Sequence, residues 1–430
     1  MFSLKDFGVT KEVGLLENGT RVVLFKRSGT PISTAVAFNS GSRFDPVGKE
    51  GLAHFTEHML FKKNKRFKSE TEMAEYLEKI GGHLNAGTGN EQINFYADIS
   101  DKADYGKVVT VVNEVFNNME LDSKMFENER NVILKEIADG KANPRRHVYD
   151  LADILLFQGT DMGRSGIGSL ETVTSIKEED IMDFYRKLLN PSRMTIVVSG
   201  DIELKELISE YNEGMTFPSI EREPHPEFQP LMLSREKNTL IENYNDTNNN
   251  QIVIGFRTCS MFSEDRISLK MLATVCGVGF TCSLFKKLRE ENGLVYSVHA
   301  ASQVGTDSGV WVVITSTPKE TLQKLFDLVA EEFERIYNGG ITDAELHLAK
   351  AKYLKSKKQS MQTSGSWVSF HTTGELFDPH KAMALDEYMN KVNRVTLADL
   401  RRVGKKYFGR GLWYLAMCGD ATEKDFKINY

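Results

Sequence analysis

The chain of 430 residues contains little cysteine, no long apolar run and no excess of positive charge. Its four cysteines (Cys259, Cys276, Cys282 and Cys418) include no CxxC pair and are too few for a disulfide framework, which favours a reducing compartment. No apolar run reaches the ~18 residues of a membrane-spanning helix, so we expect no membrane association. The net charge of −6, from 54 lysines and arginines against 60 acidic residues, argues against nucleic acid as a partner.

The first residues of the sequence are not expected to form a signal peptide. The first residues, MFSLKDFGVTKEV, carry Lys5, Asp6 and Lys11 where a signal peptide would have an apolar run. The composition, with 40% hydrophobic and 27% charged residues, is typical of a globular protein. We therefore expect a cytoplasmic protein without a membrane anchor.

Proline is scarce except in one segment. Four of the ten prolines fall between residues 218 and 230, within a charged stretch that favours extended conformations. This segment predicts a linker at 218–230 between a first domain at 1–217 and a second domain at 231–430. Two domains also agree with the length of the chain, since single domains usually span roughly 100 to 200 residues.

The two halves are similar in plan. The first half opens on an Asn18-Gly19 hairpin signal and ends on MTIVVSGD, and the second half ends on the similar LWYLAMCGD. Helices are expected near 51–62, 70–80, 102–118, 123–138, 177–189, 266–276, 281–290, 318–337 and 343–360, and strands at STAVAFNSG, INFYADIS, QIVIGF, VYSVHAAS and GVWVVITS. The pattern predicts an α+β fold with two homologous α/β-sandwich domains, each a mixed, mainly antiparallel sheet covered by helices.

The segment GLAHFTEHMLF, residues 51–61, places titratable groups in an apolar helix. At about 100° per residue, His54 and His58 lie about 40° apart on the helix, and Glu57 falls within the same ~100° arc. Two imidazoles so placed could share one metal ion, and their neutral nitrogens suit Zn²⁺. Glu57, held beside the metal without binding it, could take a proton from a reacting water.

Chance is the alternative explanation of this HxxEH motif, since short motifs recur and a single histidine is usually a solvated side chain. The apolar context favours a metal site. Leu52, Phe55 and Met59 make the helix a core element, and burying unpaired polar groups in it would cost about 1–3 kcal/mol or more for each group. One metal ion would satisfy all of them.

A catalytic zinc needs a third protein ligand. The helix predicted around MFENERNVILKEIADG offers Glu129 and Glu136, which are two turns apart and project from the same face. One could bind the metal while the other supports the site. Acidic residues on helices are most often solvated, and spacing alone does not choose between these interpretations.

The chain resembles the insulinase/pitrilysin family of zinc peptidases, the inverzincins with an HxxEH motif, and in particular its short two-domain members related to the mitochondrial processing peptidase subunits. Beyond HxxEH, the resemblance is carried by the ERxVIxxEI-like segment that starts at Glu129, by GGHLNAGTGNEQINFYADI and by NPSRMTIVVSGD. It implies one zinc per chain, with Glu136 as third ligand beside His54 and His58, and with Glu129 as the neighbour that supports the site.

The same resemblance implies further site residues. Asn85 and Ala86 correspond to an edge strand that binds the peptide as an added strand, although Asn85 could also be an ordinary turn residue after two glycines. Arg289 and Tyr296 match the residues that complete the active site from the second domain. Without the resemblance, Tyr296 would be an ordinary strand aromatic and Arg289 a solvated helix residue. The remaining histidines have no ligand-like spacing and are expected to be structural; if one of them lines the site, it is expected to be His299.

These expectations together indicate a zinc metalloendopeptidase that cleaves oligopeptides or unfolded chains bound in extended form. Glu57 is expected to act as general base, with Tyr296 and Arg289 stabilising the oxyanion or holding the substrate backbone. A homodimer hinged at 218–230 would close a chamber around the substrate. The alternatives are a processing-peptidase subunit that needs a different partner chain, and a non-enzymatic scaffold subunit.

Overall fold

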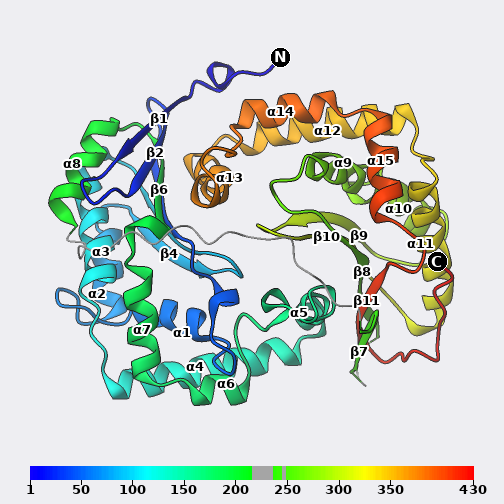
Figure 1. Ribbon diagram of the computed structural model, residues 1–430, viewed down its shortest axis with the longest axis horizontal. Helices are drawn as coiled ribbons and strands as arrows, with labels where there is room; N and C mark the ends of the chain where they lie inside the picture. The colour runs from blue at the N-terminus through cyan, green and yellow to red at the C-terminus, as the bar shows by residue number, and fades with distance from the viewer. Residues whose placement is uncertain (216–235, 245–247) are drawn as a thin grey trace. The chain divides into compact units, whose positions relative to one another are not determined.

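The computed structural model describes residues 1–215, 236–244 and 248–430, which form two compact units (Figure 1). Unit 1 consists of Met1–Ile137, Ser165–Glu227 and Lys358–Tyr388, and unit 2 of Ala138–Arg164, Phe228–Lys357 and Met389–Tyr430. The linker expected at 218–230 lies outside the described residues. The division into domains at 1–217 and 231–430 therefore stays a prediction.

Unit 1 is built on a mixed sheet with the strand order β1-β2-β6-β3-β5-β4. Its strands are β1 (Thr10–Leu15), β2 (Arg21–Lys26), β3 (Ile32–Phe38), β4 (His83–Thr88), β5 (Ile93–Ile99) and β6 (Met194–Gly200). Only β2 and β6 pair in parallel; the other neighbours are antiparallel. The predicted hairpin is confirmed between β1 and β2, where Gly19 adopts a φ of 84° that favours glycine.

Helices cover both faces of this sheet, because alternate residues of each central strand are buried on opposite sides. On β2, Val22 and Leu24 belong to the core that includes apolar residues of α1 (Leu52–Leu60), α3 (Tyr105–Asn117) and α8 (Leu204–Gly214). Phe25, the next residue along, contacts Trp367 on α13 (Ser364–Phe377). Figure 1 shows α13 on one side of β6, and α3 and α8 on the other.

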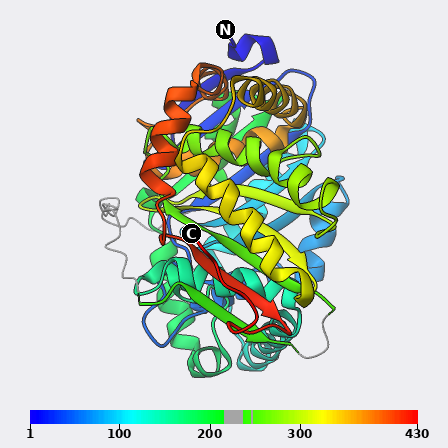
Figure 2. The same ribbon diagram turned by 90° about the vertical axis from the view of Figure 1, so that its right-hand side faces the viewer.

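Unit 2 repeats this plan with the strand order β7-β11-β8-β10-β9. Its strands are β7 (Thr239–Asn243), β8 (Asn250–Thr258), β9 (Val298–Val304), β10 (Gly309–Thr317) and β11 (Tyr414–Gly419). Again one pair, β7 with β11, is parallel and the others are antiparallel. Figure 2 shows β11 in red beside green strands of this sheet. The matching order supports the duplication predicted from the two strand endings, and the α+β fold class is confirmed.

Each sheet carries a helix that comes from the other half of the sequence. Helix α13 packs on β3 and β6 of unit 1, although it follows the strands of the second half. Helix α5 (Pro144–Leu156) packs on β8 and β11 of unit 2, although it lies among the elements of the first half. The exchange is reciprocal, so each sheet buries one face against a helix that its own half does not encode.

Each of the nine predicted helices is present. In chain order they are α1, α2 (Glu70–Glu78), α3, α4 (Ser123–Ala142), α7 (Glu178–Leu188), α9 (Asp265–Gly277), α10 (Ser283–Phe285) with a π-helix at Lys286–Glu290, α11 (Leu322–Tyr337) and α12 (Asp343–Ser360). Sequence analysis did not predict α5, α6 (Leu170–Ser175), α8, α13, α14 (Leu385–Arg394) or α15 (Leu397–Tyr407). Among the described residues, no helix has the length and apolar character needed to cross a membrane.

Candidate metal centre

The helix that carries the HxxEH motif, α1, is fixed at its N-terminus by Asp45. The two carboxylate oxygens of this buried residue accept hydrogen bonds from the backbone N–H groups of Gly51 and Ala53, both at 2.9 Å. These are donors that the first turn of a helix cannot satisfy internally, and a negative charge there is favourable. Sequence analysis missed Asp45, although an acidic residue shortly before a helix is a recognisable capping signal.

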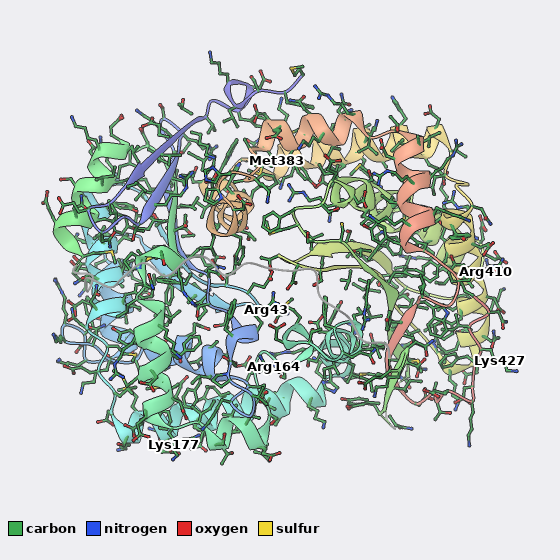
Figure 3. All side chains as sticks on the ribbon, in the orientation of Figure 1. Arg43, Arg164, Lys177, Met383, Arg410 and Lys427 are labelled. Carbon is green, nitrogen blue, oxygen red and sulfur yellow. The ribbon has the colours of Figure 1, made fainter. Side chains whose placement is uncertain are left out.

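The loop before α1 is held by a second buried charge. Arg43, labelled in Figure 3, forms an ion pair with Glu91 at 2.7 Å. Farther along, Phe55 on α1 stacks on Phe126 of α4, with ring centroids 4.9 Å apart. The motif helix is therefore anchored to the loop at its start and to α4 along its length.

His54 and His58 face each other across one turn of α1, as the spacing predicted. Their Nε2 atoms lie 3.2 Å apart, and both side chains are mostly buried. Two nitrogens bound to a tetrahedral zinc at about 2.0–2.1 Å would lie about 3.3–3.4 Å apart. The observed separation therefore matches that of two imidazoles that could hold one zinc ion.

Glu129 on α4 lies directly behind His58. Its Oε1 is 2.7 Å from Nδ1 of His58, and its Oε2 is 3.1 Å from Nζ of Lys62. With its side chain only 8% exposed, Glu129 would on burial alone have a raised pKa, but its bonds to His58 and Lys62 lower that pKa below its usual range. A carboxylate that accepts from Nδ1–H leaves the Nε2 lone pair of His58 free for a metal.

Glu57 occupies the same face of α1, and its contacts extend to the sheet. Its Oε2 accepts a hydrogen bond from Oγ1 of Thr88 at 3.3 Å, and Thr88 ends strand β4. Burial raises the pKa of Glu57, opposed by His58 and reinforced by the charge of Glu136. A carboxylate with a raised pKa is suited to accept and return a proton.

Two carboxylates compete for the position of third ligand. The ligand atoms of His54, Glu57 and His58 all lie within 4.8 Å of one another. Glu136 on α4 also approaches, with its Oε2 3.8 Å from Nε2 of His54. Distances alone therefore leave both carboxylates within reach of a metal. The assignment of Glu136 as ligand and Glu57 as base stays a prediction, which metal analysis of single variants can decide.

The strand next to the motif helix is a sheet edge. Among the described strands β4 pairs only with β5, where Asn85 lies opposite Tyr96 and Ala86 opposite Phe95. Asn85 is exposed within the strand, so its alternative interpretation as a turn residue is wrong. Because Thr88 of β4 contacts Glu57, this open edge runs directly beside the candidate metal centre.

In unit 2, Arg289 and Tyr296 come together. The guanidinium carbon of Arg289 lies 4.9 Å from the ring centroid of Tyr296, whose side chain is 82% exposed. The expectation of a strand at VYSVHAAS is wrong at its start, since β9 begins at Val298 and Tyr296 lies in a bend just before it. His299 lies on β9 opposite Ile314, and its expected place in the site stays a prediction.

Comparison with known proteins identifies the family. Residues 21–169 match the family model described as Insulinase (Peptidase family M16), and residues 175–353 match the one described as Peptidase M16 inactive domain. The chain belongs to the insulinase family of peptidases, M16. The first match contains HxxEH with Glu129 and Glu136, and the second contains Arg289 and Tyr296.

Relatives and solved structures agree with this membership. The chain is 28% identical to an uncharacterized zinc protease, YmxG, of Bacillus subtilis over 91% of this chain and 94% of the relative. It is 27% identical to an uncharacterized zinc protease of Mycobacterium leprae over 88% of this chain and 84% of the relative. A protease from Helicobacter pylori shares the fold, with a TM-score of 0.87 at 21% identity over 96% of this chain and 99% of that one. A chain of complex III2 from Candida albicans also shares it, with a TM-score of 0.83 at 18% identity over 97% and 98%.

Proposed function

We propose that this protein is a zinc-dependent endopeptidase that cleaves peptides bound in extended form. The observation that carries the proposal is the pair of imidazole Nε2 atoms 3.2 Å apart, with Nδ1 of His58 backed by Glu129. A structural histidine pair would not need both nitrogens to converge, nor a buried carboxylate to fix the tautomer of one ring. The family membership and the names of the relatives agree with zinc as the metal.

We propose His54, His58 and Glu136 as the ligands of one zinc ion per chain. The donor set of two imidazoles and one carboxylate is typical of catalytic zinc and leaves a position open. When bound, zinc supplies Lewis-acid chemistry that polarises the scissile carbonyl and makes a water molecule more acidic.

Glu57 provides the proton transfers in this proposal. Its carboxylate takes a proton from the attacking water and delivers one to the leaving amine. The hydroxyl of Thr88 holds one carboxylate oxygen, which leaves the other free to face the reacting water. The pKa of Glu57, raised by burial, brings the acid closer to the pH at which it must both accept and donate.

The substrate is proposed to add as a strand to the open edge of β4. The outward-facing backbone N–H and C=O groups of β4, in the stretch that contains Asn85 and Ala86, would bond to the peptide backbone and hold it extended. Backbone pairing selects chains that are unfolded locally. Oligopeptides and unfolded segments are therefore the proposed substrates.

Arg289 and Tyr296 are proposed to act on the same substrate from unit 2, on the strength of their match to the family. The contact between the two side chains and the exposure of Tyr296 support a role in contact with a ligand. Tyr296 would donate to the developing oxyanion, and Arg289 would hold the substrate backbone.

The proposed assembly is a cytoplasmic homodimer that would enclose the substrate. A processing-peptidase subunit that needs a different partner chain is the alternative assembly, and a non-enzymatic scaffold is the alternative function. Relatives of this fold occur both as a protease and within complex III2. Light scattering after size-exclusion chromatography of the purified chain distinguishes a homodimer from a monomer that awaits a partner.

The experiment that tests the function is a fluorogenic peptide-library assay on the zinc-loaded protein. We expect cleavage of flexible peptides that a chelator abolishes and zinc restores. Wild-type protein that carries zinc but cleaves no peptide, alone or as a dimer, would exclude an independent endopeptidase.

A further inference from the structure

The segment that carries Arg289 has an unusual backbone. Helix α10 begins at Ser283 and continues directly into the π-helix Lys286–Glu290, where the N–H of Glu291 bonds to the carbonyl of Lys286 at 2.9 Å. A π-helix bonds residue i to i+5 instead of i+4, so the side chains within it point in different directions from those of a regular α-helix. The direction of Arg289 therefore depends on this turn being maintained.

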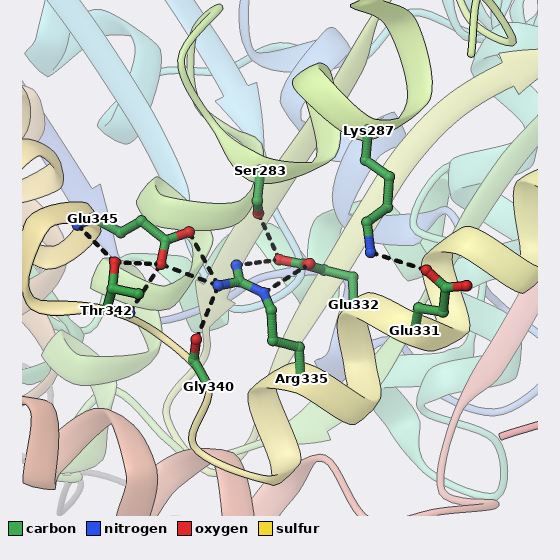
Figure 4. A network of polar contacts seen from close by, with 8 residues as sticks. All are labelled: Ser283, Lys287, Glu331, Glu332, Arg335, Gly340, Thr342 and Glu345. Atoms are coloured by element: carbon green, nitrogen blue, oxygen red, sulfur yellow. Dashed lines mark hydrogen bonds and ion pairs between the residues drawn. The ribbon is translucent and has the colours of Figure 1, made fainter. Parts of the chain in front are cut away.

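A buried carboxylate of α11 holds the start of this segment (Figure 4). The hydroxyl of Ser283 donates a hydrogen bond to Oε1 of Glu332, whose side chain is only 1% exposed. Ser283 is the first residue of α10 and lies six positions before Arg289. Glu332 thereby links the rigid helix α11 to the irregular segment.

Glu332 is itself oriented by an arginine on the next turn of α11. Arg335 donates from Nη2 to Oε1 of Glu332 at 2.7 Å and from Nε to Oε2 at 3.0 Å. Its Nη1 bonds to both oxygens of Glu345 at 3.0 Å, and Glu345 in turn accepts from Thr342. The two hydrogen bonds from Arg335 fix the orientation of the Glu332 carboxylate, with Oε1 directed at Ser283.

Stability alone is a weak reason for such a buried ion pair. Removing two charges from water is costly, and well-packed apolar side chains often stabilise a core as well or better. A second contact between the same elements, from Lys287 to Glu331 at 3.2 Å, lies at the surface, with Glu331 63% exposed, and exposed ion pairs contribute little. The buried connection through Ser283 is therefore the one that can fix the geometry of the segment.

Beyond the π-helix, the chain that leads to Tyr296 is tied to the sheet. The hydroxyl of Thr317 donates to the carbonyl of Leu294 at 2.7 Å, and that of Thr315 donates to the carbonyl of Ser297 at 2.8 Å. Tyr296, between these two anchors, is thus held by strand β10. Arg289 meets it from the π-helix, so we expect the contact between the two side chains to depend on both supports.

We propose that Glu332 is a positioning residue which, through Ser283, holds the π-turn that presents Arg289 to Tyr296 and the substrate. The inference rests on the proposed function, because it assigns Arg289 and Tyr296 to substrate. It adds a network of residues that touches neither substrate nor metal.

The test uses Ser283→Ala in the full zinc-loaded chain, with Glu331→Gln as matched control. Ser283→Ala removes the hydroxyl that links the two elements, while Arg335 still pairs with Glu332 and the core keeps its charge balance. We expect kcat/KM to fall about tenfold or more with zinc content unchanged, because small displacements of a positioning group are costly. Glu331→Gln should leave kcat/KM within about twofold.

A double-mutant cycle with Arg289→Ala separates positioning from general weakening. If Ser283 acts through Arg289, adding Ser283→Ala to Arg289→Ala should cost no further rate. Equal losses in both backgrounds, or no loss in either, would overturn the inference.

Hydrogen exchange of residues 283–296 provides a measure that does not need activity. We expect faster exchange in Ser283→Ala than in Glu331→Gln, confined to this segment. If wild-type protein cleaves no peptide, the proposed function fails. Faster exchange in Ser283→Ala would still support the role of the Ser283–Glu332 hydrogen bond in holding the segment. Exchange that is the same in Ser283→Ala as in wild type would overturn the inference, whatever the activity of the protein.

Discussion

Nδ1 of His58 lies 2.7 Å from Oε1 of Glu129, and this contact joins the motif helix α1 to α4 at the candidate metal centre. Because Nδ1 is engaged, Nε2 of His58 faces Nε2 of His54, where a metal could bind both rings. The same carboxylate also accepts from Lys62, so its negative charge is kept in a largely buried position.

Replacing Glu129 should therefore weaken zinc binding without removing a ligand. We expect Glu129→Gln to lower zinc affinity by about 10–100-fold, because the amide supports the His58 tautomer less well than a carboxylate. Competition with a chromophoric chelator measures this change. Glu70→Gln is the matched control, since Glu70 also binds Lys62 but is exposed, and equal affinities in the two variants would contradict the assigned role.

Glu57→Gln should separate chemistry from metal binding. The amide keeps size and hydrogen bonding to Thr88 but cannot accept a proton, so turnover should fall by about 10²–10⁴-fold while zinc content stays near that of wild type. Zinc analysis and kcat on the same preparation measure both. Loss of zinc from this variant would instead make Glu57 a ligand.

Tyr296→Phe tests whether unit 2 takes part in catalysis. If the hydroxyl donates to the oxyanion, kcat should fall by about 10²–10³-fold with melting temperature and zinc unchanged, since the exposed ring loses no packing. In Arg289→Ala, more of the fall in kcat/KM should come from a higher KM, because Arg289 is proposed to hold the substrate backbone. Normal kcat/KM in both variants would leave unit 2 without a catalytic role.

Asp265 should make unit 2 sensitive to acid. Burial alone would raise the pKa of this residue at the start of α9, but bonds from Lys406, Arg402 and Tyr407 of α15 lower it to about 2. Above the pKa of about 4 that an aspartate has in the unfolded chain, the ionised carboxylate therefore contributes ~2 kcal/mol to the free energy of unfolding. This contribution is lost as the pH falls toward 2.

Asp265→Asn should accordingly lower the free energy of unfolding of unit 2 by about 2 kcal/mol at pH 7 and flatten its pH dependence between about 4 and 2. Thermal unfolding followed across that range in wild type and variant measures it. An unchanged pH dependence would show that the network adds no stability.

The placement of His54 and His58 on one face of α1 was predictable because an α-helix fixes the angle between residues four apart, whatever surrounds it. The expected fold class followed in the same way from periodicity and from the repeated strand endings. Asp45 and Thr88 were not predicted, since they reach α1 from a loop and a strand whose positions depend on tertiary packing.

Other features were not predicted because they too depend on tertiary packing. Periodicity can reveal a helix but not which sheet it covers, so the exchange of α5 and α13 between the two halves could not be predicted. The segment LVYSVH is rich in valine and tyrosine, which favour strands. The positive φ of Gly293, 60°, and backbone bonds from Gly293 to Arg289 and from Leu294 to Leu288 nevertheless keep this stretch out of the sheet until Val298, so Tyr296 lies outside β9.

Zinc content by mass spectrometry tests the central claim most directly. We predict close to one zinc per chain in wild type, and a sharp loss in each of His54→Ala, His58→Ala and Glu136→Gln, because three protein ligands leave no redundancy. Wild-type protein that binds no zinc, or variants of both histidines that keep it, would contradict the site. Full occupancy in Glu136→Gln alone would contradict Glu136 as the third ligand.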